Sequence, residues 1–355
     1  MNREPNKSIK IGVVGAGMVS QIAHLPSIAA SSHVIGAGIA DLDLNLAKQV
    51  GLRFGYPIAC DSHKALFTKA ALDAVVVVTH RSVTAAIVRD ALQQGIHVLS
   101  EKPMAMTLSV AKELVGLAEK QGRVYAIGFM KRYDRGVNKA RQMLAELLAS
   151  KKLGKLIMVR GKNFCAEYVG QCDDYIRGPS RPSLPPTSPM VPEWLDPAFR
   201  GHYDWFANVG LHSVNLLRYL LERDLRCQHA ELRYTHSMSI LLDAAGVPAS
   251  LDVGKSATGR WEESFEFFFE RGRLELQLTS LKQKHCSASV TLDENVGETK
   301  THHFSDNTCP WGFDNQMQAF VDTVRGSSNG VLATGVDSLK DMELMEEIFM
   351  KGQRS

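Results

Sequence analysis

The sequence lacks the marks of several protein classes. Its apolar run Ala74–Val78 is far shorter than the roughly 20 residues that a helix needs to span a bilayer, so we expect no membrane segment. The 41 basic and 38 acidic residues leave a net charge of only +3, which argues against a nucleic-acid-binding surface. The six cysteines contain no CxxC pair, which favours reduced thiols over a disulfide or zinc framework.

The beginning of the chain also lacks a secretory pattern. Met1–Lys10 is polar and leads directly into an apolar stretch, so we expect a cytoplasmic protein without a signal peptide. The composition, 45% hydrophobic and 22% charged, is typical of a globular protein. A length of 355 residues predicts two domains, which we place at residues 1–130 and 131–355.

Short apolar runs alternate with helical stretches in the first third of the chain. Such alternation with short links predicts an α/β domain with a doubly wound parallel sheet and right-handed crossovers. Ser82 is the expected N-cap of the helix that follows the third strand. The predicted strands are Ile9–Val14, Val34–Ala40, Ala74–Thr79, Ile96–Ser100 and Arg123–Phe129, and the predicted helices are Gly17–Ala30, Leu44–Val50, Ser82–Gln94 and Leu108–Gln121.

The rhythm changes after Met130. A hairpin is expected at the turn Glu270–Arg273, because alternating apolar residues flank it on both sides. This half predicts an α+β domain with an open, largely antiparallel sheet. The strand Phe265–Phe269 is apolar on both faces, and either helices of the same chain or a second subunit would cover it. A second subunit would make a homodimer or homotetramer. The other predicted elements are the strand Leu156–Lys162 and the helices Val137–Ser150, Gln316–Arg325 and Val336–Met350.

A proline-rich segment interrupts the second half. Residues 178–197 hold seven of the 13 prolines, which excludes a helix or a central strand and predicts a long loop. Two interpretations remain open. The loop is either a surface insertion without a role, or a lid or arm next to a functional site.

A glycine-rich turn follows the first predicted strand. Gly15 suits the tight turn, Gly17 lets the backbone approach a pyrophosphate at the helix N-terminus, and Ser20 takes the third small position. Asp41 ends the second strand, where a carboxylate can bind the adenosine ribose hydroxyls, although it could instead cap a helix. Leu42 rather than arginine follows Asp41, so NAD is favoured over NADP.

The tripeptide Glu101-Lys102-Pro103 follows the strand Ile96–Ser100, at the sheet edge where doubly wound folds bind ligands. Together with His24-Leu-Pro26, Gly128–Asp134 and Asn208–Leu220, it resembles the glucose-fructose oxidoreductase / inositol dehydrogenase / MocA family of NAD(P)-dependent oxidoreductases. The resemblance covers most of the chain and implies a Rossmann domain followed by an open-sheet domain.

The resemblance also implies site residues. Lys102 would act beside the nicotinamide, and His212 would be the general base on a substrate hydroxyl. Asn208 takes the family's acidic position and, four residues from His212, would share one face of a helix with it. Asn208 would orient the substrate or the imidazole, since a side-chain amide neither takes up nor releases a proton in catalysis. The expected cofactor contacts are Gly15, Gly17, Met18, Val19, Asp41, Thr79, His80, Glu101 and Lys102.

Other patterns are weighed against this hypothesis. Thr79-His80-Arg81 departs from the family's usual segment near the nicotinamide. Trp205-Phe206-Ala207 replaces the glycine triplet that often precedes the segment with Asn208 and His212. His202, Asp204 and His212 do not share a face that would hold a metal, so we expect none. Lys131, Arg132 and Arg135 form a basic cluster, usually a solvated helix start, which would suit an anionic substrate only if it faced the site.

The sequence therefore predicts an NAD(P)-dependent oxidoreductase acting on a hydroxyl or keto carbon of a sugar, cyclitol or sugar derivative. Lys102 and His212 would manage the proton. Two alternatives remain: a non-catalytic dinucleotide-binding regulator of the same fold, and a reductase of a non-sugar substrate. The expected partner is a small molecule.

Overall fold

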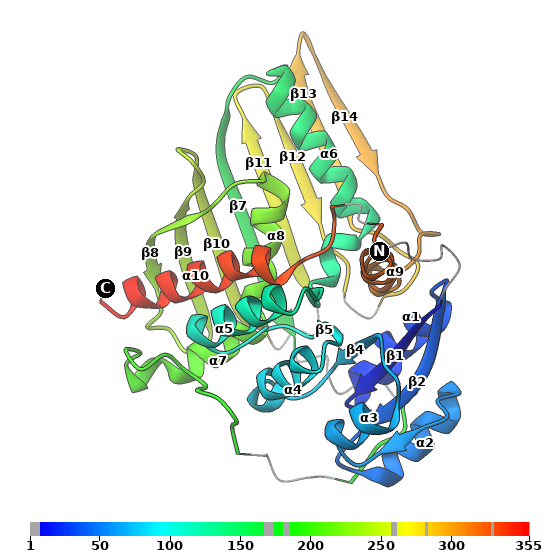
Figure 1. Cartoon of the computed structure of the whole chain (residues 1–355). Coiled ribbons are helices and arrows are strands. Elements are labelled where there is room, and N and C mark those ends of the chain that lie inside the picture. Colours follow the sequence, from blue (N-terminus) through cyan, green and yellow to red (C-terminus); the bar gives the residue numbers. More distant parts are fainter. Residues whose placement is uncertain are drawn as a thin grey trace. The chain divides into compact units, whose positions relative to one another are not determined.

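A computed structural model describes residues 8–166, 174–179, 185–256, 261–280, 283–327 and 330–354, with only the backbone of 165 and 166. The chain forms two compact units (Figure 1). The first comprises Met1–Phe129, Cys172–Pro192 and Phe313–Leu339, and the second comprises Met130–Gln171, Glu193–Gly312 and Lys340–Ser355. The chain leaves the first unit after Phe129 and returns to it twice. The predicted domains, 1–130 and 131–355, do not contain these returns.

The first unit contains a parallel sheet of the Rossmann type. Its strand order is β3-β2-β1-β4-β5-β6, and every neighbouring pair is parallel. The central strands are buried on both faces, as parallel strands must be, and Ile11, Val13 and Val76 are fully buried. The strands are β1 (Ile9–Val14), β2 (Val34–Ala40), β3 (Ala59–Cys60), β4 (Ala74–Val77), β5 (His97–Ser100) and β6 (Tyr125–Ile127).

Several helices of this unit begin at side-chain caps. Asp43 accepts from the N–H groups of the first turn of α2, and Thr107 does the same for α5. The prediction of Ser82 as a cap is wrong, because α4 begins one residue earlier and its N-cap is His80. The helices are η1 (Ser20–His24), α1 (Leu25–Ala30), α2 (Leu44–Phe54), α3 (His63–Lys69), α4 (Arg81–Gln93), α5 (Leu108–Lys120) and α9 (Gly312–Val324). β3 and α3 are short and were not among the predicted elements.

The second unit contains an eight-stranded sheet with the order β14-β13-β12-β11-β7-β10-β9-β8. Only β7 and β10 pair in parallel, which confirms a largely antiparallel sheet. The predicted hairpin is β11 paired with β12. The strands are β7 (Leu156–Ala166), β8 (Arg226–Glu231), β9 (Ser237–Asp243), β10 (Pro248–Ser256), β11 (Glu262–Phe269), β12 (Gly272–Gln277), β13 (Ser289–Val296) and β14 (Glu298–Phe304).

Helices cover one face of this sheet. Helix α6 contacts β12 and β13, and α8 contacts β7 (Figure 1). Phe265 and Phe267 are fully buried on this face, so helices of the same chain cover them. The remaining helices are η2 (Met130–Tyr133), α6 (Arg135–Ser150), η3 (Pro197–Phe199), α7 (Arg200–Asn208) and α8 (Gly210–Leu221), while α10 (Gly335–Gly352) belongs to both units.

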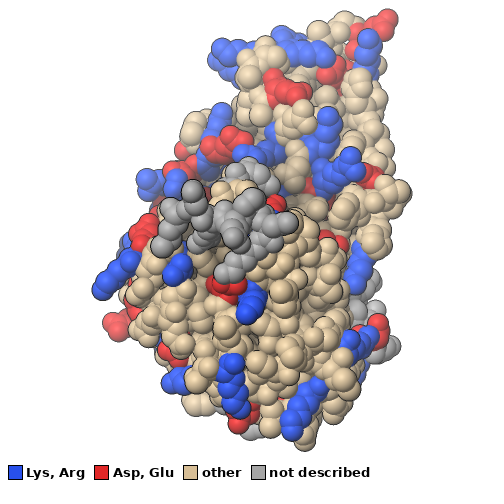
Figure 2. Space-filling model, turned by 45° about the vertical axis from the view of Figure 1, so that its right-hand side comes forward, with Lys and Arg blue, Asp and Glu red and all other residues tan. Residues whose placement is uncertain are grey.

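The proline-rich segment has no helix or strand in its described part before η3. Residues 180–184 of it lie outside the described residues. Basic and acidic side chains are interspersed over much of the face drawn in Figure 2, in keeping with the small net charge. Within the described ranges, no helix is both long and apolar enough to cross a membrane.

Candidate active site

The glycine-rich turn directly follows β1. Gly15 has a φ of +100°, and a Cβ there would lie 2.1 Å from the Val78 carbonyl oxygen, so this position requires glycine. Gly17 is exposed, and a Cβ on it would meet nothing within 4 Å. The buried Ser20 hydroxyl donates to the Gly15 carbonyl oxygen at 2.5 Å. The buried Ser20 therefore holds the turn in place, while the side of the turn at Gly17 is open. This arrangement fits a pyrophosphate bound to the backbone.

Met18 and Val19 begin the helical segment after the turn. Met18 is half-buried, and Val19 is 37% exposed. Both lie within the first helical turn, where the unsatisfied N–H groups favour an anion. Their predicted contact with the cofactor stays a prediction that their position allows.

Asp41 lies beside this turn. Its Oδ2 accepts from the Ala16 N–H at 2.9 Å, and its Oδ1 accepts from the Asp43 N–H at 2.9 Å. The cap of α2 is Asp43, so the helix-cap interpretation of Asp41 is wrong. The half-buried Asp41 therefore places a carboxylate against the glycine turn, at the end of β2.

The order of the strands reverses between β1 and β4. The crossover β1–α1–β2 runs toward one edge of the sheet and β4–α4–β5 toward the other, so right-handed connections put α1 and α4 on opposite faces. Dinucleotides bind in the crevice at such a switch point. Thr79 lies there and bonds Thr84 through its hydroxyl at 2.9 Å, while His80 Nδ1 lies 2.8 Å from the Ser82 hydroxyl.

Glu101 and Lys102 follow β5 at the same edge. The Glu101 N–H donates to the Val77 carbonyl at 2.9 Å, and Glu101 Oε2 accepts from the backbone N–H of Lys102 at 3.2 Å. Lys102 is half-buried, and its bond to Pro103 is cis. A Cβ at Gly128 would lie 3.1 Å from Glu101 Oε1, so the Glu101 carboxylate packs closely on that backbone.

His24 holds the other oxygen of Glu101. Its Nε2 lies 2.8 Å from Glu101 Oε1, and the imidazole is only 1% exposed. The ring also meets Phe313 edge to face, with centroids 5.3 Å apart. His24 was not among the predicted site residues, although it stands in the motif His24-Leu-Pro26. Its position one helical turn beyond Ser20 was the available signal.

The second pair of predicted residues lies in the second unit. His212 is in the first turn of α8 and is 7% exposed. Asn208 ends α7 and is exposed. Val209 separates the two helices, so the prediction that Asn208 and His212 share a face of one helix is wrong. The break fits Gly210, where a Cβ would lie 2.4 Å from the Phe206 ring.

The basic cluster after the last Rossmann strand is not a solvated helix start. Lys131 is 6% exposed and forms an ion pair with Glu263. Arg132 is 5% exposed and donates to Asn215 at 2.7 Å. Only Arg135 is exposed, with an ion pair to Asp306. Burial of Lys131 and Arg132 favours a structural role over an anionic substrate contact.

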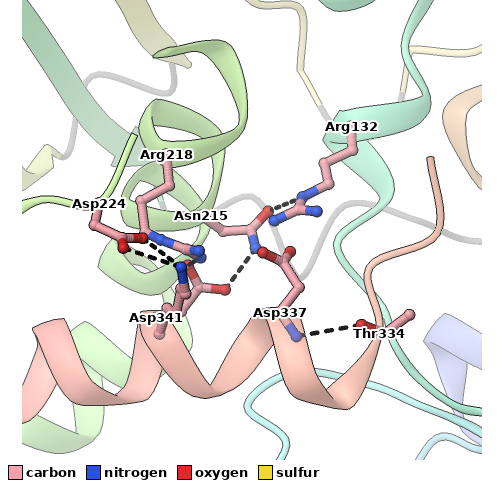
Figure 3. A network of polar contacts seen from close by, with 8 residues as sticks. Arg132, Asn215, Arg218, Asp224, Thr334, Asp337 and Asp341 are labelled. Atoms are coloured by element: carbon pink, nitrogen blue, oxygen red, sulfur yellow. Dashed lines mark hydrogen bonds and ion pairs between the residues drawn. The ribbon is translucent and has the colours of Figure 1, made fainter. Parts of the chain in front are cut away.

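Figure 3 shows the network that Arg132 joins. Asn215 donates to Asp341 at 2.6 Å, and Arg218 pairs with the other oxygen of Asp341 at 2.6 Å. Asp341 is fully buried. The network thus ties η2, α8 and α10 of the second unit together. Within the described part of the chain, no group of three His, Cys, Asp or Glu residues is placed to hold a metal ion.

Comparisons with known proteins place these features in context. Residues 9–129 match the family described as an oxidoreductase family with an NAD-binding Rossmann fold. The chain is 29% identical over 255 residues to D-xylose 1-dehydrogenase (NADP(+)) 2 of Haloferax volcanii, covering 72% of this chain and 69% of that protein. It is 22% identical over 339 residues to inositol 2-dehydrogenase 3 of Saccharopolyspora erythraea, covering 91% and 87%.

A solved structure shares the fold of nearly the whole chain. It is KijD10, a 3-ketoreductase from Actinomadura kijaniata, in complex with NADP and TDP-benzene. The TM-score is 0.74 at 20% identity, over 97% of this chain and 98% of that one.

Proposed function

Since residues 9–129 belong to the glucose-fructose oxidoreductase / inositol dehydrogenase / MocA family, we propose that this protein transfers hydride between NAD(P) and a hydroxyl or keto carbon of a sugar, cyclitol or sugar derivative. The observation that carries the proposal is the placement of Lys102 and the glycine turn at one edge of one sheet. The names of the xylose and inositol dehydrogenases support the substrate class.

The proposed roles follow from the proton balance. Oxidation of an alcohol carbon sends a hydride to the nicotinamide, and the hydroxyl proton must leave to a nearby base. Lys102, held by its backbone to Glu101, is the proposed proton handler on the first unit. His212 is the proposed general base of the second unit, and Asn208 the proposed orienting group. In the reverse direction the same groups return the proton to the carbonyl oxygen.

We propose NAD as the preferred cofactor. A 2′-phosphate at the adenosine ribose would meet the carboxylate of Asp41, and the next residue, Leu42, offers no positive charge. One relative is named for NADP(+) and one similar structure contains NADP, so the affinities for NAD and NADP are both to be measured.

The proposal is tested with the purified protein. NAD and NADP are titrated first, and a panel of sugars and polyols is then screened by nicotinamide absorbance. Lys102→Ala should bind the dinucleotide as the wild type does while turnover falls by roughly a hundredfold or more. Lys112→Ala, an exposed lysine of α5, is the matched control and should keep full turnover. Wild-type turnover in Lys102→Ala would contradict the role.

The roles of the second unit need their own variants. His212→Asn should lower turnover without changing the affinity for the dinucleotide. Asn208→Asp restores an ionisable group at the exposed end of α7 and should keep activity. Tight dinucleotide binding with no substrate oxidised in a broad panel would instead favour the non-catalytic regulator.

We also propose a homodimer or homotetramer formed through the sheet of the second unit. The face opposite α6 and α8 carries ion pairs, among them Arg273 with Glu266 at 2.9 Å and with Asp293 at 3.3 Å. Leu241 is 44% exposed on β9. Sedimentation of wild type and Leu241→Glu tests this, since a buried glutamate would weaken the assembly.

A further inference from the structure

The backbone around Lys102 leaves the sheet at Ser100 and is buried again at Met104. We call Glu101–Met104 the Lys102 turn. It has no helix or strand of its own, yet Met104 is only 1% exposed and Ser100 is fully buried. Buried backbone outside helices and strands needs hydrogen-bond partners from elsewhere in the fold. Glu101 supplies one such contact, to the Lys102 N–H, and a residue inside the sheet supplies another.

This inner contact comes from Tyr125 on β6. Its hydroxyl donates to the Met104 carbonyl at 3.2 Å, and the Ser100 hydroxyl lies 3.4 Å from it. Burial raises the pKa of Tyr125 above its ordinary value of 10, so the hydroxyl keeps the proton that it donates. Because a hydroxyl has only one proton, Ser100 is the donor in the second contact. A single hydroxyl thus bonds the residue before the Lys102 turn and the residue that ends it.

The Tyr125 ring is itself held in place. Tyr125 pairs with Val98 of β5, and on the other edge of β6 the Ile127 N–H donates to the Ala333 carbonyl at 2.8 Å. A Cβ at Gly335 would lie 2.9 Å from the Tyr125 ring, so the backbone at Gly335 packs closely on it. All of these residues belong to the first unit. The Tyr125 hydroxyl is therefore a fixed point from which the Lys102 turn is held.

Tyr56 is a buried tyrosine of the same unit without such a role. It is 8% exposed, against 4% for Tyr125. Its ring packs on β2, where a Cβ at Gly36 would lie 2.9 Å from it. Within the part of the chain that the structure describes, its hydroxyl has no hydrogen-bond partner. The Tyr56 ring therefore fills space, whereas the Tyr125 hydroxyl joins the two ends of one turn.

We propose that Tyr125 is a positioning residue for Lys102, because its hydroxyl fixes both ends of the Lys102 turn and thereby the place of the Lys102 amine at the sheet edge. This inference rests on the proton-handling role proposed for Lys102 above. It deepens that role by adding a residue that no sequence motif marks. At 4% exposure, Tyr125 acts through the turn rather than on the substrate.

The first test replaces Tyr125 with phenylalanine, which removes the hydroxyl and keeps the ring. Turnover is measured with the substrate found in the sugar and polyol panel. Tyr125→Phe should lower kcat and kcat/KM together by about fivefold to tenfold, the effect of one or two lost hydrogen bonds. Its Kd for the dinucleotide should stay at the wild-type value, because the glycine-rich turn is unchanged. Tyr56→Phe, the same change at the other buried tyrosine, is the matched control and should keep wild-type turnover.

A double variant separates positioning from a general structural effect. If Tyr125 acts only through Lys102, Tyr125→Phe should have no further effect on kcat when Lys102 is already alanine. A general structural effect would instead lower kcat by the same factor in both backgrounds. That additive result overturns the inference, and so does wild-type kcat in Tyr125→Phe alone.

The second test does not depend on turnover. A limiting amount of an amine-acetylating reagent is added, and the modified lysines are quantified by peptide mass spectrometry. The ratio of labelling at the half-buried Lys102 to labelling at the exposed Lys112 should rise several-fold in Tyr125→Phe, because a looser turn exposes the amine more often. Tyr56→Phe should keep the wild-type ratio.

An unchanged labelling ratio in Tyr125→Phe overturns the inference. A wild-type protein that binds neither dinucleotide, or that oxidises no substrate, contradicts the proposed function instead. The labelling ratio then still shows whether Tyr125 holds Lys102 in place, so the two failures are told apart.

Discussion

His24 and Glu101 show how a motif residue is held in place. The Glu101 carboxylate accepts from the Lys102 N–H through one oxygen and meets the His24 imidazole through the other. His24 in turn stands in the helical segment that begins at the glycine turn. The sequence placed Glu101 at the carboxyl edge of the sheet and His24 in the first helix, but only the fold shows that the side chains of His24 and Glu101 meet. They are 77 residues apart in sequence.

The His24–Glu101 contact predicts a difference between two similar variants. The contact uses Nε2 of His24, and a glutamine places its amide nitrogen near that atom, whereas an asparagine reaches only the Nδ1 position. His24→Gln should therefore keep turnover close to wild type, and His24→Asn should lower kcat about tenfold or more by releasing Glu101. Dinucleotide affinity and KM should change little in both. Equal kcat values for the two variants would show that Nε2 does not position Lys102.

Asp41 predicts the choice of cofactor. Replacing it with serine removes the carboxylate that a 2′-phosphate would meet, beside the Ala16 N–H. The ratio of kcat/KM for NADP to that for NAD should rise about tenfold or more in Asp41→Ser, because about 1.4 kcal/mol of repulsion is lost. Steady-state kinetics with both cofactors measures the ratio. Asp43→Ser, which keeps the cap of α2, is the control and should leave the ratio unchanged.

At the scale of elements, the pattern of apolar residues predicted the strands whose bounds depend on local sequence alone. The strands β1 and β2 were predicted at the residues where the structure has them, because short apolar runs with clear breaks mark them. Predictions from local sequence were wrong where a contact with another residue determines the structure. His80 rather than Ser82 caps α4, and the ring of Phe206 against Gly210 accompanies the break before His212. Lys131 is buried because Glu263, 132 residues away, pairs with it.

The start of α6 illustrates a contact that joins two elements. The Asp134 carboxylate accepts from the N–H groups of Gly136 and Val137 in the helix and from Ala288, next to β13. Asp134→Ala removes both the cap and the tie and should lower the free energy of unfolding by about 1–2 kcal/mol. Asp134→Asn keeps the acceptor and should cost less. Urea unfolding of the three proteins measures the difference.

The pH dependence of the same position has a defined sign. Burial raises the pKa of Asp134 above its ordinary value of 3.8, with the backbone N–H groups opposing the shift. The folded state thus holds this proton more tightly than the unfolded state. The stabilisation is complete below the ordinary pKa and is lost as pH rises through the raised pKa. Asparagine does not ionise, so the stability of Asp134→Asn relative to wild type should rise as the pH rises from the ordinary pKa of 3.8 through the raised pKa. An opposite trend would contradict the shift.

For the whole molecule, the path of the chain is what the sequence could not supply. The chain changes units after Phe129, Gln171, Pro192, Gly312 and Leu339, which makes five crossings. Composition marks the proline-rich segment as a loop but does not tell which unit it joins. That depends on partners such as Gln21, 155 residues from Ile176. Likewise α9 looks like any C-terminal amphipathic helix, yet its Asp314 accepts a hydrogen bond from Ser27 of α1.

These crossings predict that the two units unfold together. Helix α10 is continuous through Leu339 and Lys340 and therefore belongs to both units, so the second unit cannot lose it without disturbing the first. All four tryptophans, at 194, 205, 261 and 311, lie in the second unit, whereas the glycine turn lies in the first. Tryptophan fluorescence thus reports on a unit that does not contain the dinucleotide turn.

Saturating NAD should nevertheless raise the melting temperature detected by tryptophan. At a free NAD concentration a hundredfold above Kd, binding adds about 2.7 kcal/mol to the free energy of unfolding of the first unit. If the two units unfold together, the second unit gains the same stabilisation. Far-UV circular dichroism, which reports on both units, should give the same midpoint as tryptophan fluorescence, both without NAD and with it. An increase seen by circular dichroism but absent from the tryptophan signal would mean that the units unfold independently. The continuous helix α10 would then not couple the unfolding of one unit to the unfolding of the other.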